Sequence, residues 1–363
     1  MNDSRSLALD PGSSMLDARK SENDTVIKQC IKYIVDSVGA ENIDALILVG
    51  SFSRGEGIVA EDNGKLRWLS DLEFVAVVRV SAFARLRVQR VKLENGVENH
   101  INSSGINTKV SLGFTTKKHL RKLKPYIFTI EMKKYGKVLW GDKSALEIIP
   151  DFSYTDIDPK DGFILLNNRI VEQLMLLDKI ETGCPVYQYE IDKGYIQIVN
   201  SILAFKILYK SLYSEKKEAF FKIYGKIEYL KYIVPALEDR VRLAFASFKD
   251  LDIKPLSKEK ALNEWKNLRS CIRSVWIYEA SNLTGNDVYD IKILINVFTA
   301  IPGVKNRIRG WIKYFISKGK SFPDIRTSPQ FKIYEKAISE YSSDKADMVR
   351  ICNIVEEWKR YVK

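Results

Sequence analysis

Two short groups of residues in the first third of the chain have the types and spacing that handle phosphate and metal. Gly50 and Ser51 follow an apolar run and open a glycine-rich turn that contains Arg54, and Asp71 and Glu73 stand two positions apart before a second apolar run. Glycine lets backbone amides approach a phosphate closely, and a serine hydroxyl adds a donor. Carboxylates at alternate positions of a strand share one face, where they can hold a divalent cation. The pattern predicts a phosphate loop followed by a metal-binding carboxylate pair.

Hydrophobic periodicity predicts an α/β domain around these residues. An amphipathic helix is expected to start at Thr25, its N-cap, and to end at Gly39. Alternating and continuous apolar runs predict the strands of a mixed sheet, at residues 45–50, 72–80, 106–115 and 136–142. Residues 1–24 lack such a pattern, which predicts a flexible N-terminal arm. The α/β domain is therefore expected over residues 25–150.

Beyond this domain the strand pattern nearly vanishes and helical periodicity takes over. Pro150 and Pro159 bracket an Asp-rich stretch that is the best candidate for a boundary. The helical patterns that follow cover residues 164–180, 195–213, 219–232, 236–248, 258–280, 288–300, 305–317 and 330–362. Residues 151–363 are therefore expected to form an all-α helical domain.

Composition and charge restrict the class of protein without choosing a partner. The chain has 363 residues, of which 45% are hydrophobic, and a net charge of +12, which favours an anionic ligand such as a nucleotide, a nucleic acid or a phosphorylated small molecule. Two histidines and four dispersed cysteines do not form a zinc motif. No apolar stretch is long enough to span a membrane, and the N-terminus does not resemble a secretory signal. A cytoplasmic globular protein with no membrane partner is expected.

The turn and the carboxylate pair together resemble the signature of the DNA polymerase beta-like nucleotidyltransferase superfamily. The sequence Gly-Ser-Phe-Ser-Arg-Gly-Glu-Gly, which begins at Gly50, is similar to a sequence in bacterial small-molecule nucleotidyltransferases. The segment 136–142 is similar to a short strand and turn of those domains. The resemblance implies that Gly50 and Ser51 hold nucleotide phosphates, and Arg54 in the same turn is a further predicted contact to the nucleotide. The resemblance also implies that Asp71 and Glu73 bind Mg²⁺ and are the catalytic carboxylates.

One departure from that signature concerns a third carboxylate, which members of the superfamily usually carry on the next core strand. Here the matching position is Ser111, and residues 99–130 contain no acid. Three explanations stay open. The domain could bind nucleotide without catalysing transfer, a carboxylate such as Glu56 or Glu131 could enter the site, or the acceptor's nucleophile could already be an anion that needs no base.

The resemblance implies that the helical half closes over the nucleotide and shapes the acceptor pocket. Lys206 and Arg169 each interrupt an otherwise apolar helical pattern, so Lys206 is predicted to contact the nucleotide and Arg169 is a further candidate, against the alternative that both are surface cations.

The leading hypothesis is Mg²⁺-dependent transfer of a nucleoside monophosphate from a nucleoside triphosphate, with ATP the first choice, to a small-molecule acceptor with release of pyrophosphate. The alternatives are a nucleotide or RNA acceptor and a catalytically degenerate nucleotide sensor. Acceptor identity and oligomeric state do not follow from the sequence.

Overall fold

The chain is divided into two compact units, each of which is described here by itself. The structure is a computed structural model that describes residues 11–62, 65–103, 105–247 and 255–284, together with positions 336–337, 340, 350–351 and 353–354. The first unit comprises Met1–Lys124 and Phe128–Asp151, and the second comprises Pro125–Ile127 and Phe152–Lys363. The first unit is built on a mixed sheet, and the described part of the second is helical.

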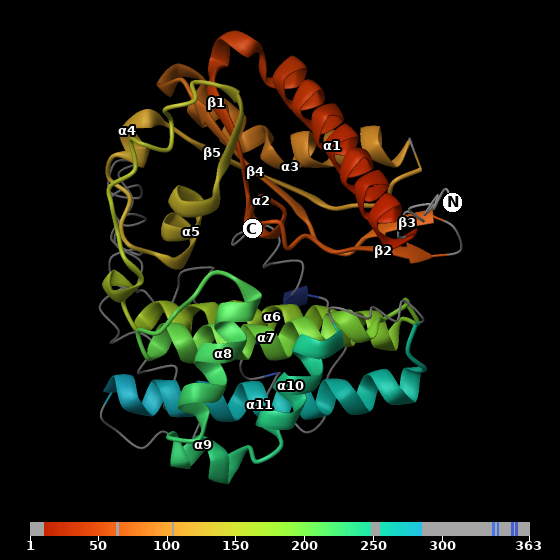
Figure 1. The fold of residues 1–363 in the computed structure, drawn as a ribbon, viewed down its shortest axis with the longest axis vertical. Coiled ribbons are helices and arrows are strands. Elements are labelled where there is room, and N and C mark those ends of the chain that lie inside the picture. Colours follow the sequence, from red (N-terminus) through yellow and green to blue (C-terminus); the bar gives the residue numbers. More distant parts are fainter. Residues whose placement is uncertain are drawn as a thin grey trace, which may run out of the picture. The chain divides into compact units, whose positions relative to one another are not determined.

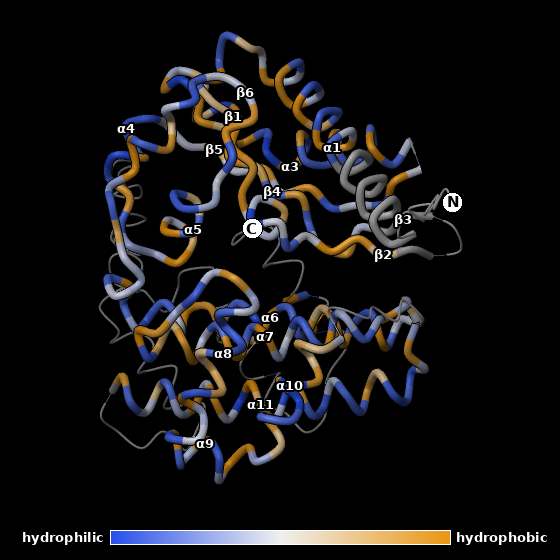
Figure 2. Tube along the Cα trace, in the orientation of Figure 1, coloured by the Kyte–Doolittle hydropathy of each residue, from blue (hydrophilic) through white to orange (hydrophobic). Residues whose placement is uncertain are grey.

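A four-stranded sheet of order β5-β4-β1-β6 forms the centre of the first unit. Its strands are β1 (Ile43–Val49), β4 (Leu72–Val78), β5 (Val110–Thr115) and β6 (Lys137–Gly141). β1 pairs antiparallel with both β4 and β6, whereas β4 pairs parallel with β5. The two central strands are almost wholly buried, and Figure 2 shows that their residues are mostly apolar. A strand buried on both faces needs a continuous apolar run, which both β1 and β4 have.

Helices cover both faces of this sheet. On one face, α1 (Pro11–Val38) and α3 (Val80–Asn102) pack on the side chains of Leu46, Leu48, Phe74 and Ala76. The opposite face, which includes Ala45, Ile47, Val49, Val75 and Val77, packs on α4 (Lys117–Leu120), α5 (Ile127–Tyr135) and the segment after β6. Because side chains alternate along a strand, Glu73 lies on the face that α4 and α5 cover.

Two backbone donors of the outer strand β5 bond to side chains of α3. The amide of Val110 donates to Glu98 Oε1 and that of Leu112 donates to Glu94 Oε1, each at 2.9 Å. Carboxylates that occupy the edge of a sheet prevent another strand from pairing there. β5 is therefore held in register by α3 as well as by β4.

Several boundaries in the first unit differ from the sequence-based predictions. α1 begins at Pro11, so part of the expected flexible arm is helical and Thr25 lies within the helix instead of capping it. Proline suits the first turn of a helix because its missing N–H has no intrahelical partner there. β5 begins at Val110, later than the expected strand at residue 106.

The second unit is built from helices around one apolar core. These helices are α6 (Lys160–Glu181), α7 (Gln188–Phe205), α8 (Tyr213–Tyr224), α9 (Glu228–Ile233), α10 (Leu237–Ser247) and α11 (Lys258–Thr284), preceded by the short turn η2 (Tyr154–Asp156). Apolar and polar residues alternate along α6, α7 and α11, as amphipathic helices require (Figure 2). The core includes Phe163, Tyr195, Leu268 and Trp276.

The helix predicted over residues 195–213 is two helices. α7 ends at Phe205 with Lys206 as its C-cap, and Ile207 has a φ of 58°. α8 starts only at Tyr213, and the helix predicted over residues 219–232 is likewise divided, between α8 and α9, at Gly225. The apolar periodicity continues across the first break without glycine or proline, so the sequence shows no stop signal there. The patterns at residues 288–300 and 305–317 lie outside the described residues, as does most of 330–362.

In the part of the chain that the structure describes, no helix combines the length and the apolar character that a membrane crossing requires.

Candidate functional site

Strand pairing brings the turn and the carboxylates together, although residues 52–70 separate them in sequence. Val49, the last residue of β1, is the partner of Glu73 on β4. Gly50 therefore leaves the sheet directly beside Glu73, at the start of the short helix α2 (Gly50–Arg54). The predicted phosphate loop is in fact this helix followed by a turn.

Gly50 meets the Glu73 side chain at a distance that only glycine allows. The φ of Gly50 is +72°, and a Cβ at this position would lie 1.7 Å from Oε2 of Glu73. Any other residue would be strained in its backbone and would displace the carboxylate. Glycine is therefore required at position 50 by its backbone angle and by the close approach of the Glu73 carboxylate.

Asp71 and Glu73 flank Leu72, which is fully buried in the core against α1 and α3. Alternation along β4 therefore directs the Glu73 carboxylate to the opposite face of the sheet, and Asp71 immediately precedes the strand. Across the β4–β5 pair, Glu73 is aligned with Ser111. The hydroxyl of Ser111 thus occupies the position beside the carboxylate pair where the resemblance leads one to expect a third acid.

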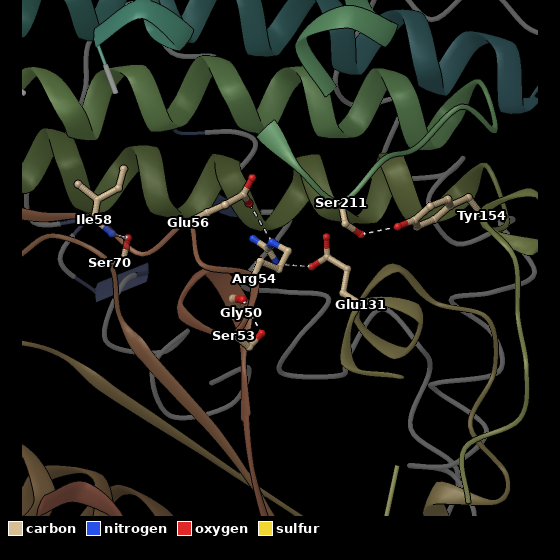
Figure 3. Close-up of polar contacts among 9 residues, drawn as sticks. All are labelled: Gly50, Ser53, Arg54, Glu56, Ile58, Ser70, Glu131, Tyr154 and Ser211. Atoms are coloured by element: carbon tan, nitrogen blue, oxygen red, sulfur yellow. Dashed lines mark hydrogen bonds and ion pairs between the residues drawn. The ribbon is translucent and has the colours of Figure 1, made fainter. Parts of the chain in front are cut away.

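The start of α2 has backbone donors that its cap residue does not satisfy. Its N-cap is Val49, which makes no side-chain capping bond. Within α2, the Ser53 hydroxyl donates to the carbonyl of Gly50 at 2.8 Å (Figure 3). The first amides of a helix attract anions through their free N–H groups and the helix dipole. In this short helix, those amides belong to Gly50, Ser51, Phe52 and Ser53.

Arg54, predicted to hold a phosphate, binds two carboxylates of the protein itself. Its Nε lies 3.0 Å from Oε2 of Glu56, and its Nη1 lies 2.8 Å from Oε2 of Glu131 on α5 (Figure 3). Glu56 and Glu131 are the two acids that the sequence suggested as substitutes for the third carboxylate. In the structure, both form ion pairs with Arg54.

The long interval between Ser51 and Asp71 contains an antiparallel hairpin, made of β2 (Val59–Asp62) and β3 (Lys65–Trp68). The buried Ser70 hydroxyl accepts a 3.0 Å bond from the amide of Ile58, which joins the two ends of the hairpin immediately before Asp71 (Figure 3). The interval is therefore a folded hairpin whose two ends are joined by a hydrogen bond.

An aromatic contact fixes this insert to α2. Trp68 of β3 stacks on Phe52 of α2, with ring centroids 4.8 Å apart. A Cβ on Gly57 would lie 2.3 Å from the Phe52 ring, so Gly57 leaves room for that ring.

The residues that the structure describes contain no cluster of three or more His, Cys, Asp or Glu side chains able to hold a metal. A pair of carboxylates is nonetheless sufficient for Mg²⁺, which protein sites commonly bind through one or two carboxylates and the phosphates of the substrate. Asp71 and Glu73 fit that minimal arrangement.

Lys206, the remaining predicted nucleotide contact, belongs to the second unit. Its Nζ lies 5.2 Å from the ring centroid of Tyr278 and 5.7 Å from that of Phe205. Its charge also partly offsets the effect of burial on Glu279, whose pKa burial raises to about 8. Arg169, the other candidate cation, forms an ion pair with Glu172 one turn along α6. No contact in the described residues tests the nucleotide role predicted for Lys206.

Comparisons with known proteins show little similarity. No protein-family model matches the sequence, and no curated protein matches it. Among solved structures, the chain is similar to the crystal structure of spectinomycin adenyltransferase AAD(9) from Enterococcus faecialis with ATP and spectinomycin, with 13% identity and a TM-score of 0.42 over 69% of this chain and 98% of that one. A likeness at this level is too weak to transfer an activity.

Proposed function

We propose that this protein is a nucleotidyltransferase that moves a nucleoside monophosphate from a nucleoside triphosphate, with ATP the first candidate, to a small-molecule acceptor. In this reaction an acceptor oxygen forms a bond to the α-phosphorus. The bond between that phosphorus and the bridging oxygen breaks, and pyrophosphate leaves. The proposal assigns phosphate binding to Gly50 and Ser51, and divalent-metal binding to Asp71 and Glu73.

The close approach of Gly50 to Glu73 is the observation that carries the proposal. The first backbone amides of α2, which can donate to a phosphate, and a carboxylate, which can bind a cation, are adjacent because Val49 and Glu73 are paired. An anion and a cation bound side by side are what a metal–triphosphate complex presents.

The proposed reaction assigns phosphate binding and metal binding to different residues. The amides of α2 and the Ser51 hydroxyl would bind and orient the phosphates, and Asp71 and Glu73 would hold Mg²⁺. A bound Mg²⁺ supplies charge neutralisation for the triphosphate. Positioning and electrostatic stabilisation of this kind account for most of the catalysis in transfers at phosphorus.

The nature of the acceptor determines whether a base is needed. A hydroxyl acceptor must lose a proton, whereas a phosphate or carboxylate acceptor attacks as an anion. Ser111 occupies the place beside Glu73, and the acids Glu56 and Glu131 are ion-paired with Arg54. These observations favour an acceptor whose nucleophile is already an oxyanion.

The same Ser111 favours a second candidate function, a sensor that binds nucleotide without transferring it. One assay separates the two. The full-length protein is incubated with labelled nucleoside triphosphates, Mg²⁺ and pools of anionic and neutral acceptors, and pyrophosphate release is measured. We expect release that depends on an acceptor and that falls by about 100-fold or more in Asp71→Asn.

The control is Asp151→Asn, because the Asp151 side chain is 95% exposed on the surface of the first unit. It should release pyrophosphate as the wild type does. Nucleotide binding without release for any acceptor would instead support the sensor, and label recovered in RNA would identify a nucleic-acid acceptor. Absence of both binding and release would overturn the proposal.

A further inference from the structure

The side chain of Arg54 joins three segments of the first unit. Arg54 is the last residue of α2, Glu56 follows it after one residue, and Glu131 comes from α5. The guanidinium contacts Glu56 through Nε and Glu131 through Nη1, at 3.0 and 2.8 Å (Figure 3). These are charge-assisted hydrogen bonds, the stronger class of such bonds in proteins.

The three side chains are largely removed from water. Arg54 is 8% exposed, and Glu56 and Glu131 are each 15% exposed. Ion pairs that water screens contribute little, but a partly buried cluster depends strongly on each member. If the guanidinium were lost, two carboxylates would face one another with little solvent between them.

This cluster is connected to Ser51 through the backbone. The amide of Glu56 donates to the carbonyl of Ser51 at 2.9 Å, and Gly55 between the two charged residues is in the left-handed region. α2 is a little over one turn long, so its own hydrogen bonds give it little stability. Its position relative to α5 therefore depends on Arg54.

We propose that Arg54 is a positioning residue that fixes the Gly50–Ser51 turn by binding Glu56 and Glu131, and that it does not itself touch the nucleotide. The inference rests on the proposed role of that turn in binding phosphate. It replaces the phosphate contact that the sequence suggested for Arg54, and it assigns Glu131 to the support of α2 instead of proton removal.

Two variants distinguish these roles, because the two roles predict opposite effects of Glu131→Gln on nucleotide binding. Arg54→Lys keeps the charge but loses the planar fork that reaches two carboxylates. Glu131→Gln keeps the shape and removes one charge. If Arg54 is a positioning residue, each variant should weaken ATP binding by about tenfold. The double variant should bind ATP no more weakly than the single variant with the lower affinity. If Arg54 binds phosphate directly, Glu131→Gln should bind ATP as well as the wild type or better.

A role of Glu131 as the base predicts a third pattern. Glu131→Gln would then lower kcat with KM unchanged, and it would remove the acidic limb of the pH profile. Positioning predicts the reverse, a raised KM for ATP and an unaltered pH profile.

Amide hydrogen exchange at residues 51–56 tests the proposal independently of activity. Both variants should exchange about tenfold faster there than the wild type, while β1 and β4 should be unaffected. Arg242→Lys is the matched control, because its partner Glu238 lies on the exposed surface of α10, where a salt bridge contributes little. Unchanged exchange in both Arg54→Lys and Glu131→Gln would overturn the proposal. Faster exchange in a protein that binds no nucleotide would overturn only the proposed function.

Discussion

Two glycines of the α2 turn have similar backbone angles but different surroundings. Gly50 and Gly55 have φ values of +72° and +77°. A Cβ on Gly50 would collide with the Glu73 carboxylate, whereas a Cβ on Gly55 would have no atom within 4 Å. The first glycine is needed for the position of a functional group, and the second only for the shape of the turn.

This contrast predicts different outcomes for two identical substitutions. Gly50→Ala should displace Glu73 and lower pyrophosphate release by about 100-fold, because a misplacement of about 1 Å at a reacting centre has effects of that order. Gly55→Ala should cost about 1 kcal/mol of stability through its backbone angle and leave kcat nearly intact. Steady-state kinetics with urea denaturation measures both. Equal losses of activity would show that the Gly50–Glu73 contact is not specific.

At the scale of elements, the junction between α7 and α8 has an unusual helix end. The amide of Leu208 donates to the carbonyl of Leu203 and that of Ile207 donates to Ala204, which is the bonding pattern of a Schellman motif. The left-handed position of that motif is usually glycine, but here it is Ile207 with a φ of 58°. A β-branched residue is strained there.

Relief of this strain should stabilise the helical unit. Ile207→Gly is expected to raise the free energy of unfolding by about 1 kcal/mol, because the Ile207 side chain is partly exposed and little packing is lost. Ile207→Ala retains a Cβ and should gain little. Urea denaturation of both variants is the measurement. A loss of stability in Ile207→Gly would mean that packing of the isoleucine outweighs its backbone strain.

At the scale of the whole molecule, each unit has its own apolar core, and the second also contains a buried acid. Glu279 of α11 is fully buried, and both of its carboxylate oxygens lie within 2.9 Å of the Ser201 hydroxyl on α7. Ser201 also contacts the Gly162 carbonyl of α6, at 2.7 Å. A hydroxyl has one proton, so if it donates to Gly162 it can only accept from a protonated Glu279. Burial raises the pKa of Glu279 to about 8, in agreement with a neutral acid.

This raised pKa predicts the direction of a pH effect on stability. Between the ordinary pKa of 4.5 and about 8, the folded chain keeps the Glu279 proton that the unfolded chain has lost. Because the unfolded state binds fewer protons, stability should fall as pH rises, by up to about tenfold in the folding constant per pH unit. The stabilisation that comes from the Glu279 proton is complete below pH 4.5 and is lost as the pH rises through about 8.

Glu279→Gln should remove this dependence, since an amide donates to Ser201 as a protonated acid does and does not titrate. The difference in free energy of unfolding between the variant and the wild type should favour the variant more at pH 8 than at pH 5. Denaturation at both pH values measures it. Other titrating groups are common to both proteins and cancel in the difference. Parallel stability curves would show that Glu279 does not carry the effect.

The sequence was sufficient for features that depend on neighbouring residues. The apolar runs of β1 and β4 and the helical character of the described second half follow from local periodicity. The register that aligns Ser111 with Glu73 also agrees with the position assigned from the sequence. Local patterns did not reveal the end of α7, because strain at Ile207 leaves no signal in composition.

Only the tertiary structure decided what surrounds Gly50. The sequence by itself determined that a glycine, a serine and two carboxylates stand near strands, which is enough to predict phosphate and metal chemistry. That a Cβ on Gly50 would strike Glu73, and that Arg54 binds Glu131 at a separation of 77 positions, depends on strand pairing and helix packing between distant segments. Such contacts leave no periodic pattern in the sequence, because they join segments that are far apart along the chain. The periodicity of each segment reflects only the core that it packs on.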